Sequence, residues 1–206
     1  MRIETVILEA LDGAQVEADL VRVDDARGAV VLAHPHPLFG GDRFNPVIDA
    51  LFNALVDIGF TTLRFDFRGV NNSSGSHDGG DSERLDIVAA IELLEVIDPD
   101  APIWLVGYSF GAFVSLNVVD PRVAGWVGVA PPLAAMNARC VADSDHRTKL
   151  LLVPEHDQYS TPAATADFTA SWVSCTQSTV AMADHFLNGR LDVVAEAVCA
   201  HLEAST

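Results

Sequence analysis

The sequence predicts an α/β fold in which helices cover both faces of a mostly parallel β-sheet. Short apolar runs alternate with stretches of helical periodicity along most of the chain. This alternation is typical of parallel strands joined by right-handed helical crossovers. No internal repeat or low-complexity linker interrupts it, so we expect residues 1–206 to form one domain. In such a sheet the functional site lies at the carboxyl ends of the strands.

The first part of the chain predicts a hairpin followed by a strand and a helix. Residues 3–10 and 14–23 flank Leu11-Asp12-Gly13, a turn signal that favours an antiparallel pair of strands. The apolar run at 29–33 is typical of a buried parallel strand. Residues 46–58 place apolar side chains at helical spacing, which predicts the first helix.

The middle of the chain predicts two further strands and the helices beside them. Residues 60–67 form the next strand, and residues 81–97 combine helix-starting residues with apolar positions at helical spacing. The apolar stretch 102–108 predicts a strand that leads into a glycine-rich turn. The apolar stretch 112–119 beyond that turn is helical in pattern.

The last part of the chain completes the alternation. Apolar runs at 123–130 and 149–153 predict strands, and residues 162–172 predict a helix that begins at a proline. A further strand at 178–182 and a closing helix at 189–202 follow. The loop between 130 and 149 is too short for a separate cap domain.

Ser109 is the first candidate functional residue. It lies in Gly107-Tyr108-Ser109-Phe110-Gly111, between the strand at 102–108 and the following helix. A serine on a sharp strand-to-helix turn needs small neighbours, and the two glycines supply them. The start of a helix adds free backbone N–H groups at the same place. This context predicts a nucleophile; the alternative is a glycine-rich turn whose serine only caps the following helix.

A serine nucleophile needs a base and an acid that orients the base. His185 follows the strand at 178–182, and Asp157 follows the strand at 149–153. Both therefore lie at carboxyl ends of strands, and we predict them as base and acid. Glu155 is the nearest competitor for the role of the acid.

The tetrahedral intermediate of such a reaction also needs two N–H donors. Phe110, which follows the nucleophile, offers one. The second is expected from the loop His34-Pro35-His36-Pro37-Leu38-Phe39-Gly40-Gly41. The prolines of this loop are excluded because proline has no N–H. Leu38 is our first choice as the donor, and His36 or Phe39 is the alternative. The His-x-His spacing is the one pattern that suggests a metal pair, but no acidic ligand is patterned beside it, so we predict no metal.

Four motifs carry a resemblance to a known family. They are the loop 34–41, Arg64-Phe65-Asp66-Phe67-Arg68-Gly69-Val70, the turn around Ser109, and Ala183-Asp184-His185-Phe186. Together they resemble compact, lidless serine hydrolases of the α/β-hydrolase superfamily, and are similar to the small predicted esterases related to dienelactone hydrolases. The resemblance spans roughly residues 28–202.

The resemblance implies an eight-stranded α/β-hydrolase fold, a Ser-Asp-His triad and hydrolysis of an ester-like bond without a cofactor. Dienelactone hydrolases proper usually carry cysteine where this chain has Ser109. Pro154 and Asn71 stand where the family commonly has glycine. Asn71 tolerates a positive φ better than most residues. Asp66 and Arg68 are expected to hold their turn by hydrogen bonds.

Charge and composition restrict the possible partners. The chain has 29 acidic and 12 basic residues, a formal charge of −17, which disfavours nucleic acid and anionic membranes. It shows neither a leader-like apolar segment at the N-terminus nor a membrane-spanning run, so we expect a cytoplasmic location. The three cysteines are widely spaced and indicate no disulfide framework. The expected partner is a small-molecule ester, and the sequence leaves the oligomeric state open.

These observations predict a hydrolase of small carboxylic esters, with thioesters, lactones and small amides as further possibilities. Residues 131–136, with Leu38, Phe39, Phe110, Tyr159 and Phe186, are expected to form a shallow apolar acyl site. The alternative is a non-catalytic protein of the same fold that binds a small molecule or another protein.

Overall fold

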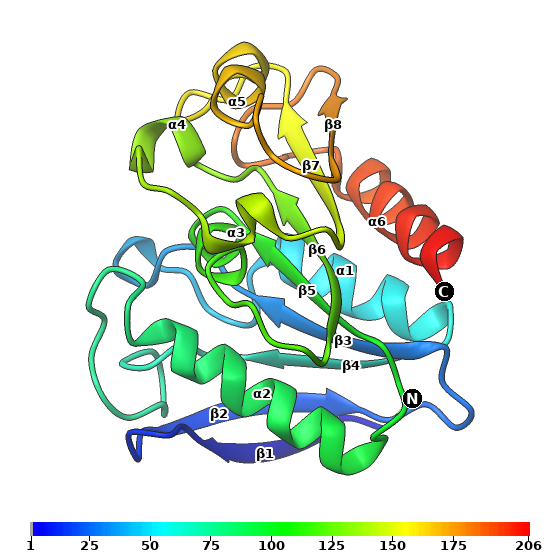
Figure 1. The fold of residues 1–206 in the computed structure, drawn as a ribbon. Helices are drawn as coiled ribbons and strands as arrows, with labels where there is room; N and C mark the ends of the chain where they lie inside the picture. The colour runs from blue at the N-terminus through cyan, green and yellow to red at the C-terminus, as the bar shows by residue number, and fades with distance from the viewer. Residues whose placement is uncertain (1) are drawn as a thin grey trace.

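The computed structural model describes residues 2–206, which are built around one eight-stranded sheet (Figure 1). The order of the strands across the sheet is β1-β2-β4-β3-β5-β6-β7-β8. The strands are β1 (Glu4–Glu9), β2 (Gln15–Val21), β3 (Gly28–Ala33), β4 (Phe60–Phe65), β5 (Ile103–Tyr108), β6 (Val123–Val129), β7 (Thr148–Pro154) and β8 (Cys175–Val180). β2 is antiparallel to both β1 and β4, and all other neighbours are parallel. The predicted hairpin and the mostly parallel sheet are therefore confirmed.

Helices cover both faces of the sheet, as predicted. The helices are α1 (Pro46–Asp57), α2 (Glu83–Ile97), α3 (Phe110–Ser115), α4 (Leu133–Met136), α5 (Pro162–Phe168) and α6 (Leu191–Ser205), with short 3-10 turns η1 (Pro37–Phe39) and η2 (Val141–Ser144). The α1 and α6 helices pack side by side on one face, and α2 and α3 lie on the other (Figure 1).

Each face of the sheet has its own hydrophobic core. In β3, Val30 and Leu32 belong to the core under α1 and α6, whereas the alternate residues Ala29, Val31 and Ala33 belong to the core under α2 and α3. All six residues of β3, β4 and β5 are buried, because helices cover both sides of these strands. The continuous apolar runs in the sequence follow from this two-sided burial.

Several elements differ from the predicted bounds: the helix predicted at 162–172 ends at Phe168, and the closing helix predicted at 189–202 runs from Leu191 to Ser205. The last strand occupies Cys175–Val180 instead of 178–182, and it pairs with β7 from Lys149 to Pro154. It is an edge strand with several exposed polar residues, so it lacks the apolar run that marks the central strands. The helix after Ser109 ends at Ser115 and not near residue 119.

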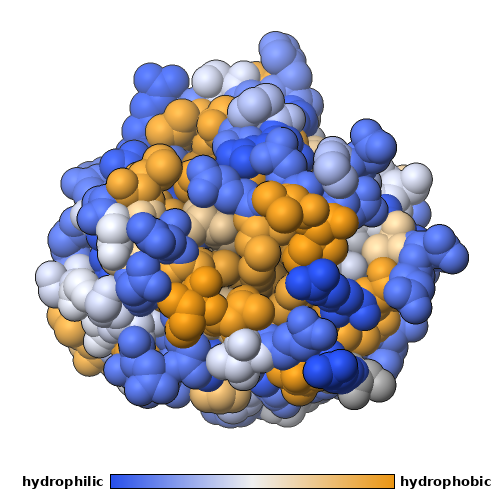
Figure 2. Space-filling view, turned by 90° about the horizontal axis from the view of Figure 1, so that it is seen from below, coloured by the Kyte–Doolittle hydropathy of each residue, from blue (hydrophilic) through white to orange (hydrophobic). Residues whose placement is uncertain are grey.

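Only α4 and η2 lie between β6 and β7, so no cap domain covers the carboxyl ends of the strands. Within residues 2–206 no helix is both long and apolar enough to span a bilayer. Figure 2 shows the side that lies lowest in Figure 1, near β1 and β2, where apolar side chains gather in the middle of a polar rim. At this edge Ile7 of β1 is 58% exposed.

Candidate active site

Ser109 lies on a strained turn between β5 and α3. Its φ of 53° and ψ of −116° place a non-glycine residue in a conformation that L-amino acids rarely adopt. The turn directs the hydroxyl to the carboxyl end of the sheet, as the sequence predicted for a nucleophile.

The two glycines of the turn are needed because backbone atoms come very close to them. A Cβ on Gly107 would lie 2.4 Å from the nitrogen of Ala112, and one on Gly111 would lie 2.2 Å from the carbonyl oxygen of Ala33. These contacts hold α3 tightly against β3 and β5. Larger residues at either position would push Ser109 out of place.

The structure brings the three predicted residues into one hydrogen-bonded chain. Ser109 Oγ lies 2.8 Å from His185 Nε2, and His185 Nδ1 lies 2.8 Å from Asp157 Oδ2. All three side chains are buried, with residue exposures of 8%, 5% and 2% for Ser109, His185 and Asp157. Each distance is within hydrogen-bond reach, the geometry by which a base deprotonates a serine and an acid orients the base.

The carboxylate of Asp157 is fixed by its own loop. Its Oδ1 accepts the backbone N–H groups of Tyr159, at 2.8 Å, and of Ser160, at 3.0 Å. These bonds leave Oδ2 for His185. Glu155, the competing acid, accepts the N–H of Met182 instead.

Tyr108 links the strand that precedes Ser109 to the loop that carries His185. Its hydroxyl donates to the backbone carbonyl of His185 at 2.9 Å. Burial raises the pKa of Tyr108, so the hydroxyl keeps its proton and remains a donor. The ring of Tyr159 packs edge-on against the His185 imidazole, 4.6 Å between centroids. The sequence places Tyr108 beside Ser109 but gives no sign of its bond to His185, a residue 77 positions away.

The hydrogen bonds of the loop after β3 leave a different amide without an acceptor from the one chosen first. The N–H of Leu38 donates to His36 Nδ1 at 3.2 Å, and the N–H of Phe39 donates to the His36 carbonyl at 3.1 Å. In the part of the chain that the structure describes, the backbone N–H groups of His36 and Phe110 have no acceptor. Of the two alternatives to Leu38 considered from the sequence, His36 has an N–H without an acceptor, whereas the N–H of Phe39 is bonded, as is that of Leu38.

His34 has a structural role that separates it from His36. Its Nε2 accepts the N–H of Phe67 at 2.9 Å, and its Nδ1 lies 2.6 Å from the carbonyl oxygen of Pro35. Burial lowers the pKa of His34 to about 4, so the ring is neutral at pH 7. Burial, and then the neighbouring His77, lower the pKa of His36 as well.

The turn after β4 is held by hydrogen bonds, as expected. Asp66 accepts the N–H of Arg43 at 2.8 Å and the side-chain amide of Asn71 at 2.9 Å, and it forms an ion pair with the Arg43 guanidinium. Arg68 pairs with the buried Asp86 at 2.7 Å. Asn71 has a φ of 48°, the conformation for which its side chain is suited.

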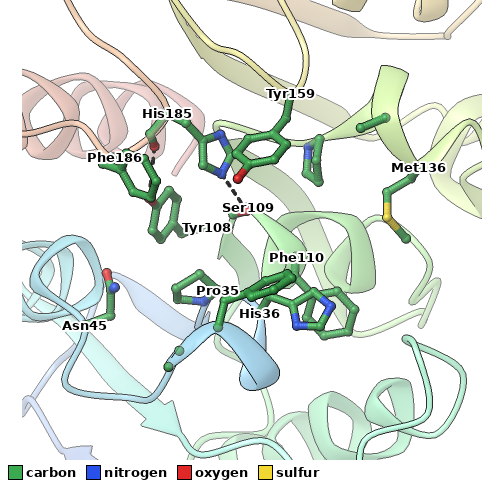
Figure 3. Close-up of a pocket in the computed structure, with 15 residues that line it drawn as sticks. Pro35, His36, Asn45, Tyr108, Ser109, Phe110, Met136, Tyr159, His185 and Phe186 are labelled. Carbon is green, nitrogen blue, oxygen red and sulfur yellow. Dashed lines mark hydrogen bonds between the residues drawn. The ribbon is translucent and has the colours of Figure 1, made fainter.

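A pocket of about 580 Å³ opens above Ser109 (Figure 3). Most of the predicted acyl-site residues line it, including Phe39, Phe110, Met136, Tyr159 and Phe186. Leu38 does not line it and instead lines a second cavity of about 530 Å³. The remaining lining residues are Pro35, His36, Gly40, Gly41, Asn45, Tyr108, Pro132, Ala135 and His185.

Comparison with known proteins agrees with this arrangement. Residues 30–202 match the model of the alpha/beta hydrolase family. The chain belongs to this family. The match includes most of β3, all later strands and all three residues of the hydrogen-bonded chain.

Similar solved structures include a serine hydrolase homologue and a serine hydrolase that lacks a lid. A serine hydrolase homologue from Coxiella burnetii is 30% identical, with a TM-score of 0.86 and 98% of each chain covered. A serine hydrolase without lid from Xanthomonas campestris is 26% identical, with a TM-score of 0.85 over 98% of this chain and 94% of that one.

One further relative is an uncharacterized protein of Rickettsia prowazekii. It is 40% identical over 108 residues, which are 51% of this chain and 45% of that protein. The chain therefore matches less than half the length of this relative.

Proposed function

We propose that the protein is a serine hydrolase that cleaves small carboxylic esters through an acyl-enzyme intermediate. The hydrogen-bonded chain Ser109-His185-Asp157 at the base of an open pocket carries this proposal. Thioesters, lactones and small amides present the same kind of carbonyl carbon to the nucleophile.

His185 accepts the proton of Ser109 through Nε2 as Oγ attacks the ester carbonyl carbon. Asp157 holds the Nδ1–H tautomer and stabilises the imidazolium that forms. His185 then protonates the departing alcohol, which leaves the acyl group on Ser109. Water, activated by His185 in the same way, releases the acid and restores the free hydroxyl.

The amides of Phe110 and His36 stabilise the oxyanion of each tetrahedral intermediate. Their lack of other acceptors within residues 2–206 supports this role. Phe110 is the first residue of α3, so its N–H also benefits from the positive end of the helix dipole. Preorganised donors of this kind are often the largest single contribution to catalysis.

The size and openness of the pocket support a small substrate. No cap domain would cover a long acyl chain, and the lining is mainly apolar. Proteins that share the fold at low identity include Est1E from Butyrivibrio proteoclasticus, solved with ferulic acid and 17% identical, and an esterase from Pyrococcus furiosus, 18% identical. Their names are consistent with ester chemistry on this fold.

Replacing the nucleophile tests the proposal. Ser109→Ala should lower kcat for phenyl acetate by several orders of magnitude, because the remaining residues cannot form the acyl-enzyme. Ser115→Ala is the matched control, since Ser115 is buried at the end of α3, the helix that follows Ser109, and its hydroxyl has no partner among the described residues. Equal activity of the Ser109→Ala variant and the wild type would exclude Ser109 as the nucleophile.

A further inference from the structure

The pocket has two chemically different ends. Figure 3 shows Met136 and Asn45 on opposite sides of Ser109. The end at α4 is apolar and includes Pro132, Ala135 and Met136. The other end carries the side-chain amide of Asn45, which immediately precedes α1. An ester seated on Ser109 thus extends one arm toward an apolar wall and the other toward an amide.

The orientation of the Asn45 amide is fixed by the helix that follows it. Asn45 Oδ1 accepts the backbone N–H of Val47 at 3.0 Å and so caps α1. This bond decides which atom of the amide is oxygen and which is nitrogen. It leaves Nδ2 as the free group at the pocket, and Nδ2 donates no hydrogen bond within residues 2–206.

The charge of the lining restricts the ligand further. Among the described residues that line the pocket there is no Asp, Glu, Lys or Arg. A charged substrate would lose hydration here without gaining an ionic partner, which is costly. The lining therefore favours an uncharged ester.

On the basis of the proposed function, we propose that Asn45 determines specificity, and that the preferred substrates are uncharged esters with a hydrogen-bond acceptor oxygen on one arm. The Nδ2–H group donates to that oxygen, which is an ether, hydroxyl or carbonyl oxygen. The opposite arm is apolar and packs against α4. A donor that is already held by the cap loses little side-chain freedom when the substrate binds.

Matched ester pairs test this proposal on the acyl arm and on the alcohol arm separately. The pairs are phenyl methoxyacetate with phenyl butanoate, and methoxyethyl acetate with butyl acetate, which differ only in an oxygen that replaces a methylene. The measurement is kcat/KM by pH-stat for the wild type, Asn45→Ser and Asn45→Asp. Both replacements keep a side-chain oxygen that can cap α1, and both remove the Nδ2 donor.

For each pair, the result is the ratio of kcat/KM for the ether ester to kcat/KM for its hydrocarbon partner. In both variants this ratio should fall about threefold to tenfold in at least one pair. A change of this size corresponds to the loss of one neutral hydrogen bond. Asn53→Ser, on the exposed side of α1, should leave both ratios at the wild-type value. Ratios within twofold of the wild type for both pairs and both variants would overturn the role of Asn45.

The outcome for the wild type separates this proposal from the one on which it rests. Hydrolysis of the four esters with unchanged ratios would contradict the role of Asn45 alone. A wild type that hydrolyses none of them, and whose Ser109 does not react with a fluorophosphonate, would contradict the proposed function itself and with it the role of Asn45.

Discussion

His36 acts on the loop after β3 through both its ring and its backbone. Its Nδ1 accepts the N–H of Leu38, and its own N–H is free to face an oxyanion. Since Nδ1 accepts a hydrogen bond only when it carries no proton, the lowered pKa of His36 helps to keep this turn intact at neutral pH. From the sequence alone, Leu38 and His36 were both possible donors. Which of the two N–H groups is free depends on the orientation of the His36 ring, whose Nδ1 accepts the N–H of Leu38, and no sequence pattern encodes this orientation.

Replacing His36 by proline or by alanine separates these two roles. Both variants lose the ring, but only proline also loses the N–H, and the φ of −56° at His36 suits proline. His36→Pro should therefore lower kcat about a hundredfold to a thousandfold relative to His36→Ala, the usual effect of losing one oxyanion donor. Equal kcat values for the two variants in an ester assay would show that another amide serves the oxyanion.

At the scale of elements, His34 connects the loop after β3 to the chain after β4. Its pKa in the folded protein, about 4, is below the reference value of 6.5. The unfolded chain therefore binds a proton at His34 more readily than the folded protein does. The contribution of His34 to stability is fully present above pH 6.5 and is lost as the pH falls through this interval.

Comparison of the wild type with His34→Gln tests this linkage. Between pH 7 and pH 5 the wild type should lose about 2 kcal/mol more of its unfolding free energy than the variant, because glutamine does not titrate. Urea unfolding at each pH gives the two curves. Parallel curves over this range would mean that His34 titrates normally in the folded protein.

The sequence predicts most of the elements because the central strands are buried on both sides. In β3 and β5 this burial produces uninterrupted apolar runs, and Gly107 and Gly111 mark the turn between β5 and α3. The prediction of β8 is displaced because exposed residues in this edge strand weaken the apolar pattern. The sequence pattern also does not indicate that the side-chain amide of Asn45 lines the pocket. The pair Asn45-Pro46 indicates a helix start, but only the folded chain places this cap beside Ser109.

At the scale of the whole molecule, the formal charge of −17 acts against the compact state. Several arginines are used in buried or half-buried ion pairs, such as Arg43 with Asp66 and Arg68 with Asp86, and salt screens these pairs weakly. The repulsion among exposed carboxylates is screened strongly. Salt should therefore affect the surface more than the interior.

We accordingly expect added salt to stabilise the protein. Raising NaCl from about 0.01 M to about 0.1 M shortens the screening length from roughly 30 Å to about 10 Å, which weakens the surface repulsion. The Tm at pH 7, measured by calorimetry, should increase over this range. A decrease in Tm would show that attractive ion pairs outweigh the repulsion.

The central claim is that Ser109 is a nucleophile activated by His185 and oriented toward the pocket. The most direct test is reaction of the intact protein with a fluorophosphonate, followed by mass spectrometry of the protein and its peptides. We predict a single adduct, located on Ser109, that does not form in Ser109→Ala and forms much more slowly in His185→Ala. An unmodified protein, or an adduct on another residue with Ser109 free, would contradict the claim.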